Sequence, residues 1–264
     1  MKRYAISRAF GALLAASFAA LPAAAAAAQV PAPAPSAAPA PSAGEILARL
    51  DANMSYRDIR YSGRMEITIG GETRYKTMTA VARGSDKAFA EFTNPEDRGT
   101  RYLKLGQNLW IYFPAEQDTV KISGYLLKEG MMGSDVSYED ALESQDYKAK
   151  YRASLGGRAV VDGRECYVLR LDARVPSAAY DRRVMWVDAG RYVVLKEDMY
   201  AKSGKLIKTS STLEVRRIGD RWYPTRTEFV SKLRNDTKTV FDMSKIEIDV
   251  PLDDRQFTMA ALTR

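Results

Sequence analysis

Apolar and polar residues alternate along most of this chain, with the two-residue period of strands that bury one face. Residues 59–69 show it most clearly, because their apolar side chains fall on odd positions and the pair Gly70-Gly71 follows as a hairpin turn. In the first half, similar runs predict strands at 73–83, 87–93, 100–106, 108–114 and 119–123. In the second half, they predict strands at 147–155, 158–161, 165–173, 182–187, 192–200, 205–218, 221–234 and 237–250.

The last of these runs changes parity along its length. Its apolar residues are Phe241 and Met243 at odd positions, but Ile246 and Ile248 at even positions. One extra residue keeps all of them on a single face. The sequence therefore predicts a β-bulge near Ser244-Lys245.

Two segments depart from the alternation. Ser42 precedes residues 46–54, whose apolar side chains recur at helical spacing, and this predicts a short capped helix. Residues 124–142 (GYLLKEGMMGSDVSYEDAL) place three glycines among Leu and Met residues and contain a capping-type sequence from Ser137 to Asp140. They predict a mobile apolar loop followed by a short helix.

The predicted fold class is therefore mainly β with a few helices, built on one large curved antiparallel sheet. The apolar face of such a sheet must be covered, or the sheet must close on itself. Two helical segments are too few to cover it tightly. We expect an apolar cavity between the sheet and a lid of helix and loop.

The first residues have the features of a secretory signal peptide. Lys2, Arg3 and Arg8 flank the start of an apolar run, which is too short to span a bilayer and ends in a tract of small residues. An uncharged segment rich in Pro and Ala follows and predicts an extended linker. No Cys near the cleavage site offers a lipid anchor. The expected organisation is a signal peptide at 1–28, a linker at 29–43 and one β domain at 44–264, free in the periplasm.

The composition argues against several kinds of catalytic and metal-binding site. The chain has no His and one Cys, Cys166, for which a buried and inert position is expected. Without His, the common catalytic triads and the commonest ligand of transition metals are absent. We therefore predict no catalytic residue, no metal and no cofactor. The net charge of +7 falls to a mild +4 without the three basic residues of the expected signal peptide (37 − 33). No dense basic patch is visible, so no nucleic-acid partner is expected either.

Acidic residues of the predicted short helix leave one enzymatic alternative open. Glu139, Asp140 and Glu143 lie close together in the sequence, and a carboxylate-based hydrolase would need two such groups facing each other across a cleft. The simpler interpretation is a solvated helix whose acidic residues favour its N-terminus. A metal at Asp135 and Glu139 has only the spacing of one helical turn in its favour.

The candidate ligand-binding residues are apolar side chains of the predicted strands and of the loop at 124–142. Methionine side chains are flexible and suit surfaces that accept variable acyl chains, although ordinary core packing is the alternative for each of them. Residues 108–114 are apolar on both faces, which predicts a strand covered on both sides. The candidates for the cavity wall are Met65, Ile67, Met78, Leu103, Trp110, Tyr112, Leu126, Leu127, Met131, Met132, Trp186 and Phe229. The candidates for the lid and its hinge are Gly124, Gly130, Gly133, Ser134 and Asp135.

Four runs of the sequence resemble the LolA-like outer-membrane lipoprotein-sorting proteins, in particular the branch associated with membrane exporters. They are RGTRYLK at 98–104, LWIYFP at 109–114, ISG at 122–124 and MGSDVSYED at 132–140. The resemblance implies a half-open barrel of about eleven antiparallel strands with a helical lid over an apolar cavity. It also implies that acyl chains of a lipoprotein or lipid pass from an inner-membrane exporter, of ABC or RND type, to the outer membrane, with only transient membrane contact.

Our leading hypothesis is a periplasmic carrier of acyl chains. A periplasmic lipid-sensing module that regulates a protein partner would use the same cavity and stays an alternative. An outer-membrane barrel fits less well, because charged residues such as Arg101, Lys121 and Arg183, together with Lys104, interrupt the strands.

Overall fold

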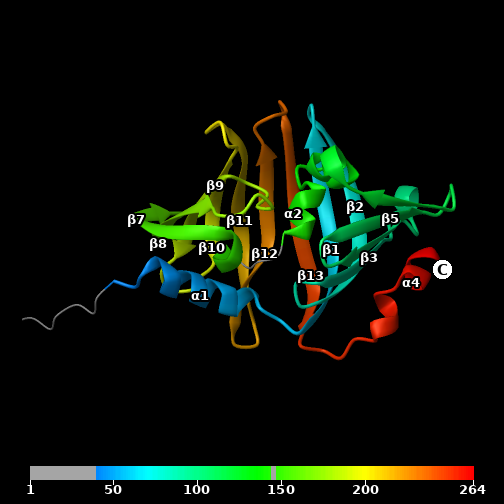
Figure 1. Ribbon diagram of the computed structural model, residues 1–264, viewed down its shortest axis with the longest axis horizontal. Coiled ribbons are helices and arrows are strands. Elements are labelled where there is room, and N and C mark those ends of the chain that lie inside the picture. The colour runs from blue at the N-terminus through cyan, green and yellow to red at the C-terminus, as the bar shows by residue number, and fades with distance from the viewer. Residues whose placement is uncertain (1–39, 144–146) are drawn as a thin grey trace, which may run out of the picture. The chain divides into compact units, whose positions relative to one another are not determined.

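The computed structural model describes residues 40–143 and 147–264, which belong to a compact unit spanning Ala40–Arg264. The expected signal peptide, and the expected linker up to residue 39, lie outside the described residues. The unit is built on one curved antiparallel sheet of thirteen strands that is not closed into a barrel (Figure 1). The strands are β1 (Asp58–Ile69), β2 (Glu72–Arg83), β3 (Lys87–Phe92), β4 (Arg101–Leu105), β5 (Asn108–Phe113), β6 (Asp118–Ile122), β7 (Tyr151–Val161), β8 (Arg164–Ala173), β9 (Arg182–Asp188), β10 (Val194–Tyr200), β11 (Leu206–Ile218), β12 (Arg221–Ser231) and β13 (Thr237–Ile248).

The order of the strands explains how one face of the sheet becomes covered. Across the sheet the order is β6-β5-β4-β3-β2-β1-β13-β12-β11-β10-β9-β8-β7, so β6 and β7, consecutive in sequence, form opposite edges. The chain between them has to travel from one edge to the other. We call residues 123–143 the crossover segment, and Figure 1 shows its helix α2 in front of the central strands. The helical elements between the two edges are η2 (Gly124–Lys128), η3 (Met131–Gly133), α2 (Tyr138–Leu142) and α3 (Tyr147–Lys150).

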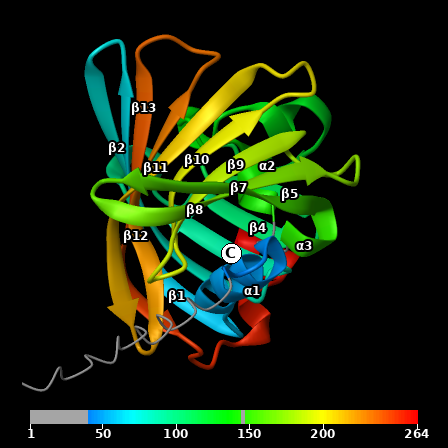
Figure 2. The ribbon, with the colours of Figure 1, turned by 90° about the vertical axis from the view of Figure 1, so that its left-hand side faces the viewer.

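Helix α1 (Ala43–Met54) covers the other half of this face (Figure 2). Its predicted cap is confirmed, since the Ser42 hydroxyl accepts a hydrogen bond from the backbone N–H of Glu45 and the Glu45 carboxylate accepts one from the backbone N–H of Ser42. Its apolar stripe packs on side chains of β8 and β9. The buried members of this cluster include Ile46, Leu47, Leu50, Leu169, Leu171, Met185 and Val187.

The predicted β-bulge in the last strand is confirmed. Arg60 pairs with Glu247 while Ser62 pairs with Ser244, so β13 carries one more residue than β1 over this stretch. Lys245 has a φ of 50°, a left-handed conformation suited to a bulge. The extra residue turns the even-numbered apolar residues to the face already used by the odd-numbered ones.

Two expectations about the elements are wrong. The strands predicted at 147–155 and 158–161 are one strand, β7, preceded by the short helix α3. The irregularity between Leu155 and Gly157 shifts the register of β7 without ending the strand. The sheet also has thirteen strands rather than about eleven.

Strand β5 is covered on both faces, as its sequence predicts. Leu109 and Ile111 lie in an apolar cluster with side chains of the crossover segment. Trp110 and Tyr112 point the opposite way and pack against a cluster that includes Leu262, near the C-terminus. The C-terminal segment, with η4 (Asp254–Gln256) and α4 (Met259–Thr263), thus covers the outer face of this part of the sheet (Figure 1), while η1 (Pro95–Asp97) joins β3 to β4.

Two further properties bear on function. Among the described residues, no helix has both the length and the apolar character that crossing a bilayer requires. The thiol of Cys166 is fully buried in β8, as expected, and this burial raises its pKa.

We predict that Leu262→Ala lowers the free energy of unfolding by about 2–4 kcal/mol, because a fully buried leucine leaves a cavity when it is truncated. Urea unfolding followed by tryptophan fluorescence measures the change. Met259→Ala, on the same helix but 41% exposed, is the control and should change stability by less than about 0.5 kcal/mol. Equal losses in the two variants would mean that α4 is not a structural cover.

Candidate functional site

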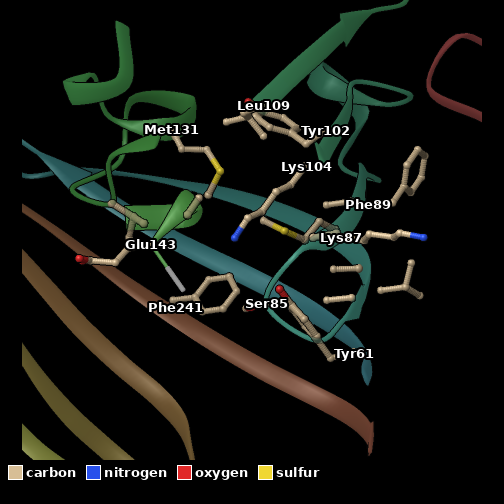
Figure 3. A pocket seen from close by; sticks show the side chains of 18 of the residues that line it. Tyr61, Ser85, Lys87, Phe89, Tyr102, Lys104, Leu109, Met131, Glu143 and Phe241 are labelled. Carbon is tan, nitrogen blue, oxygen red and sulfur yellow. The ribbon is translucent and has the colours of Figure 1, made fainter. Parts of the chain in front are cut away.

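A cavity of about 580 Å³ lies between the sheet and the crossover segment. Its lining is mostly apolar, and its volume falls within the roughly 300–1,000 Å³ of typical ligand sites. The strands contribute Met65, Met78, Phe92, Tyr102, Leu109, Phe229 and Phe241, and the crossover segment contributes Met131, Val136 and Ala141 (Figure 3). Such a space can hold a hydrocarbon chain.

The cavity exists because its floor consists of small side chains. On β2 and β3, Ala80 pairs with Ala90 and Ala82 pairs with Ala88, and all four line the cavity. A single methyl group at each of these positions leaves the space that a larger side chain would fill in a close-packed interior. The empty volume is therefore encoded by the residue types of two neighbouring strands.

Asp135 fixes the crossover segment to the sheet at the hairpin between β12 and β13. Its carboxylate is buried and accepts hydrogen bonds from the hydroxyls of Thr237 and Thr239, at 2.8 and 2.9 Å, and from the Arg234 guanidinium at 2.8 Å. It also accepts a hydrogen bond from the backbone N–H of Ser231 at 3.3 Å. This one side chain therefore ties the crossover segment to both strands.

Asp140 makes a second attachment, to β11 and to the loop before β9. It forms an ion pair with Lys208 and accepts a hydrogen bond from the hydroxyl of Tyr180 at 2.6 Å. Burial alone would raise the pKa of Asp140. The ion pair with Lys208 and the hydrogen bonds outweigh burial, so its pKa lies below the usual value.

Glu143 makes a third attachment, to the far half of the sheet. It pairs with Arg183 of β9, which is itself buried and also pairs with Glu197 of β10 at 2.6 Å. The hydroxyl of Tyr151 donates to Glu143 at 3.0 Å and accepts from Arg183 Nε at 3.1 Å. The four side chains form one hydrogen-bonded network under the end of α2.

These contacts overturn the expectation of a solvated acidic helix. Asp140 and Glu143 are largely buried and paired with cations from distant strands, 68 and 40 residues away in the sequence. Burial raises the pKa of the neighbouring Glu139, and the negative charge of Asp140 raises it further. Among the described residues, no group of three or more Cys, Asp or Glu side chains is arranged to hold a metal ion. Asp135 in particular is engaged by protein donors.

The sequence-predicted wall residues fall into three groups. Met65, Met78, Met131 and Phe229 line the cavity. Ile67, Leu126, Leu127 and Met132 belong to the same apolar cluster but pack behind the lining, and the Met132 sulfur accepts a hydrogen bond from the Tyr102 hydroxyl at 3.0 Å.

The third group lies elsewhere, against expectation. Leu103, Trp110 and Tyr112 are on the outer face under the C-terminal segment. Trp186 alternates with Met185, which faces α1, and its ring instead lies 4.4 Å from the ammonium of Lys196. Alternate residues of a strand point to opposite faces, and apolar character alone did not identify the face.

The predicted hinge residues lie at tight points of the crossover segment. Gly124 and Gly133 have positive φ values of 59° and 78°. A Cβ on Gly130 would come within 2.0 Å of the Ser134 carbonyl oxygen, so this position requires glycine. Ser134 and Asp135 are buried and anchor the segment. Whether the segment hinges at these glycines stays a prediction.

Lys104 is a charged residue of the cavity wall that was not among the binding residues predicted from the sequence. It lies on β4, is 8% exposed, and its ammonium donates a hydrogen bond to the carbonyl oxygen of Leu142 at 3.0 Å. Burial, together with the positive charge of Lys150, lowers the pKa of Lys104 to about 8, against the opposing effect of Asp86. In the sequence, the feature that could have pointed to Lys104 is its charge among the apolar residues of its strand.

Comparison with known proteins identifies relatives of this arrangement. A profile of a DUF1329-like family, described only as uncharacterised, matches residues 84–264. No protein with a curated description matches the chain significantly. A DUF1329 family protein from Desulfovibrio piger has a similar structure, with a TM-score of 0.77, 28% identity, and coverage of 82% of this chain and 96% of its own.

Two lipoprotein-sorting-type structures share the fold. A putative outer membrane lipoprotein-sorting protein domain from Vibrio parahaemolyticus has a TM-score of 0.74 and 22% identity, with coverage of 83% of this chain and 97% of its own. A LolA superfamily protein from Nitrosomonas europaea has a TM-score of 0.71 and 22% identity, with coverage of 84% of this chain and 100% of its own. These likenesses place the sheet and its crossover segment among LolA-type folds.

We predict that Asp135→Ala lowers the free energy of unfolding by about 3 kcal/mol, because it leaves buried hydroxyls and a guanidinium without their acceptor. Chemical denaturation measures the loss, and limited proteolysis should cut earlier within the crossover segment.

Glu129→Ala serves as the matched control, since Glu129 is an exposed carboxylate of the same segment. It should leave both measurements unchanged. A fully stable Asp135→Ala protein with an intact crossover segment would contradict the anchoring role of Asp135.

Proposed function

We propose, from the premise that this chain belongs to the DUF1329-like family and has the LolA-type fold, that it is a periplasmic carrier of acyl chains. It would take up the apolar part of a lipid or lipoprotein at the inner membrane and release it at the outer membrane. The role is binding and transfer, without catalysis. Its inner-membrane partner would be an exporter of the ABC or RND type.

The observation that carries this proposal is the alanine-floored apolar cavity under the crossover segment. Each CH2 group removed from water contributes about 0.8 kcal/mol, so a chain of about ten buried CH2 groups gains roughly 8 kcal/mol. A cavity lined by Met65, Met78 and Phe92 supplies the apolar surroundings for that gain. Methionine side chains adapt their shape to chains of different length.

Release requires that the cover can move without unfolding the sheet. The three carboxylates Asp135, Asp140 and Glu143 attach the crossover segment by polar contacts. Opening the segment would expose both members of each pair to water, where charged groups are well solvated. A membrane surface or a docked transporter could shift this equilibrium if it binds the open state more tightly.

We predict that Ala90→Leu weakens binding of an acyl-chain probe at least about ten-fold, because the larger side chain occupies the space on the cavity floor. Displacement of a bound fluorescent fatty-acid analogue, titrated with dodecanoate, measures the affinity.

Thr79→Leu adds the same side chain on the adjacent strand β2, at an exposed position on the opposite face. It should bind as the wild-type protein does. Equal affinity of Ala90→Leu and the wild type, with both folded, would show that acyl chains do not use this cavity.

A further inference from the structure

A buried lysine lies in the wall of the cavity, and its charge has no counter-ion among the described residues. An ammonium group carries three N–H donors, and Lys104 uses one of them, on the Leu142 carbonyl oxygen. Among the residues that the structure describes, no carboxylate lies within ion-pair distance of its Nζ. Buried charges in proteins are normally paired. The cavity wall therefore carries a positive charge that these residues do not compensate.

The neighbours of Lys104 on the sheet do not provide a negative charge. Its direct partners across the strands are Ala88 on β3 and Leu109 on β5, both apolar and both lining the cavity. In Figure 3, the side chain of Lys104 extends inward toward the side of the cavity where Met131 and Glu143 lie. The ammonium thus faces space that a ligand can enter.

The other charged side chains that line the cavity are engaged elsewhere. Lys87 points away from the cavity (Figure 3) and pairs with Asp254 at 3.1 Å. Glu143 pairs with Arg183 in the network under α2. Asp51, which lines the cavity from α1, is itself an acid and offers an anionic ligand no favourable charge. Lys104 is therefore the cation that a ligand inside the cavity would meet.

We propose that Lys104 binds an anionic oxygen group at the end of an acyl chain, so that the cargo is a single-chain lipid with a carboxylate or phosphate head held inside the cavity. This inference rests on the proposed function and narrows its cargo. A carboxylate or phosphate oxygen would accept the two remaining ammonium donors, while its chain lies along Met65, Met78 and the alanine floor.

The identity of the cargo follows from the position of the head group. An anion can reach Lys104 only from within the cavity, because the side chain is almost fully buried. The acyl chains of a lipoprotein end in methyl groups, while their other end is joined to a protein. A free single-chain lipid with an anionic head would place its chain along the apolar wall and its negative charge beside the buried ammonium of Lys104.

The alternative role of Lys104 is to tie the crossover segment through Leu142. That role predicts a loss of stability on substitution but no preference among head groups. The two roles are separated by head-group selectivity at constant chain length.

The test uses three probes with the same chain: dodecanoate, dodecyl phosphate and dodecan-1-ol. Each displaces a neutral fluorescent apolar dye from the full-length protein. We expect the wild type to bind both anions at least about ten-fold more tightly than the alcohol, since a hydrogen bond to a charged group contributes about 1.5–3 kcal/mol. The ratio between the two anions distinguishes a carboxylate head from a phosphate head.

Lys104→Met should bring the anions and the alcohol to similar affinity, with the affinity for the alcohol unchanged. Lys121→Met removes an exposed lysine of β6 that lies over Trp110 on the outer face, away from the cavity, and should keep the wild-type preference. Lys104→Arg retains the charge and should retain the preference, which shows the effect to be one of charge if Lys104→Met folds poorly.

Three outcomes are decisive. Equal binding of anions and alcohol by the wild type would overturn the head-group proposal while leaving the carrier in place. Retention of the preference in Lys104→Met, or its loss in Lys121→Met, would overturn the assignment to Lys104. Failure of all three probes to displace the dye would overturn the carrier function itself, and the head-group proposal with it.

Discussion

The arrangement of this protein depends on one topological constraint. A chain that leaves the sheet at strand β6 and returns at strand β7 has to cross the whole width of the sheet, because these strands are its two edges. The crossover segment therefore lies over one face whatever its sequence. Its contacts determine whether that face becomes a solid core or a cavity. Here three carboxylates fix the segment at separate points, and a floor of alanines leaves space beneath it.

Much of the fold could be predicted from the sequence because it rests on local patterns. Alternation located the strands, and a change of parity located the bulge at Lys245, since a strand that buries one face cannot change parity without an extra residue. The caps at Ser42 and Ser137 were likewise encoded within four residues. The break predicted between residues 155 and 158 was wrong, because the two glycines there form an irregularity inside β7.

The site could be predicted only in part, because its determinants are distant in sequence. The partners of Asp140 and Glu143 lie on strands 68 and 40 residues away, so no local pattern separates a paired carboxylate from a solvated one. Large apolar residues led to four lining residues, three of them methionines, but the cavity depends equally on small side chains, which such a search overlooks. The face of a strand that is apolar on both sides, as at Trp110, is settled only by what packs on each side.

Polar attachment of the crossover segment fits the proposed carrier function, in which the interior would accept different guests. A cover held by apolar packing alone would compete with the ligand for the same surface, and each guest would weaken its own lid. Ion pairs and hydrogen bonds at Asp135 and Asp140 hold the segment at points outside the lining of the cavity. Buried ion pairs add little net stability but impose a definite geometry, because their desolvation offsets their attraction. The contacts thus give the segment a definite position above the cavity. If the segment were displaced as a unit, Asp135 and Asp140 would return to water, and Arg183 would keep Glu197 as a counter-ion.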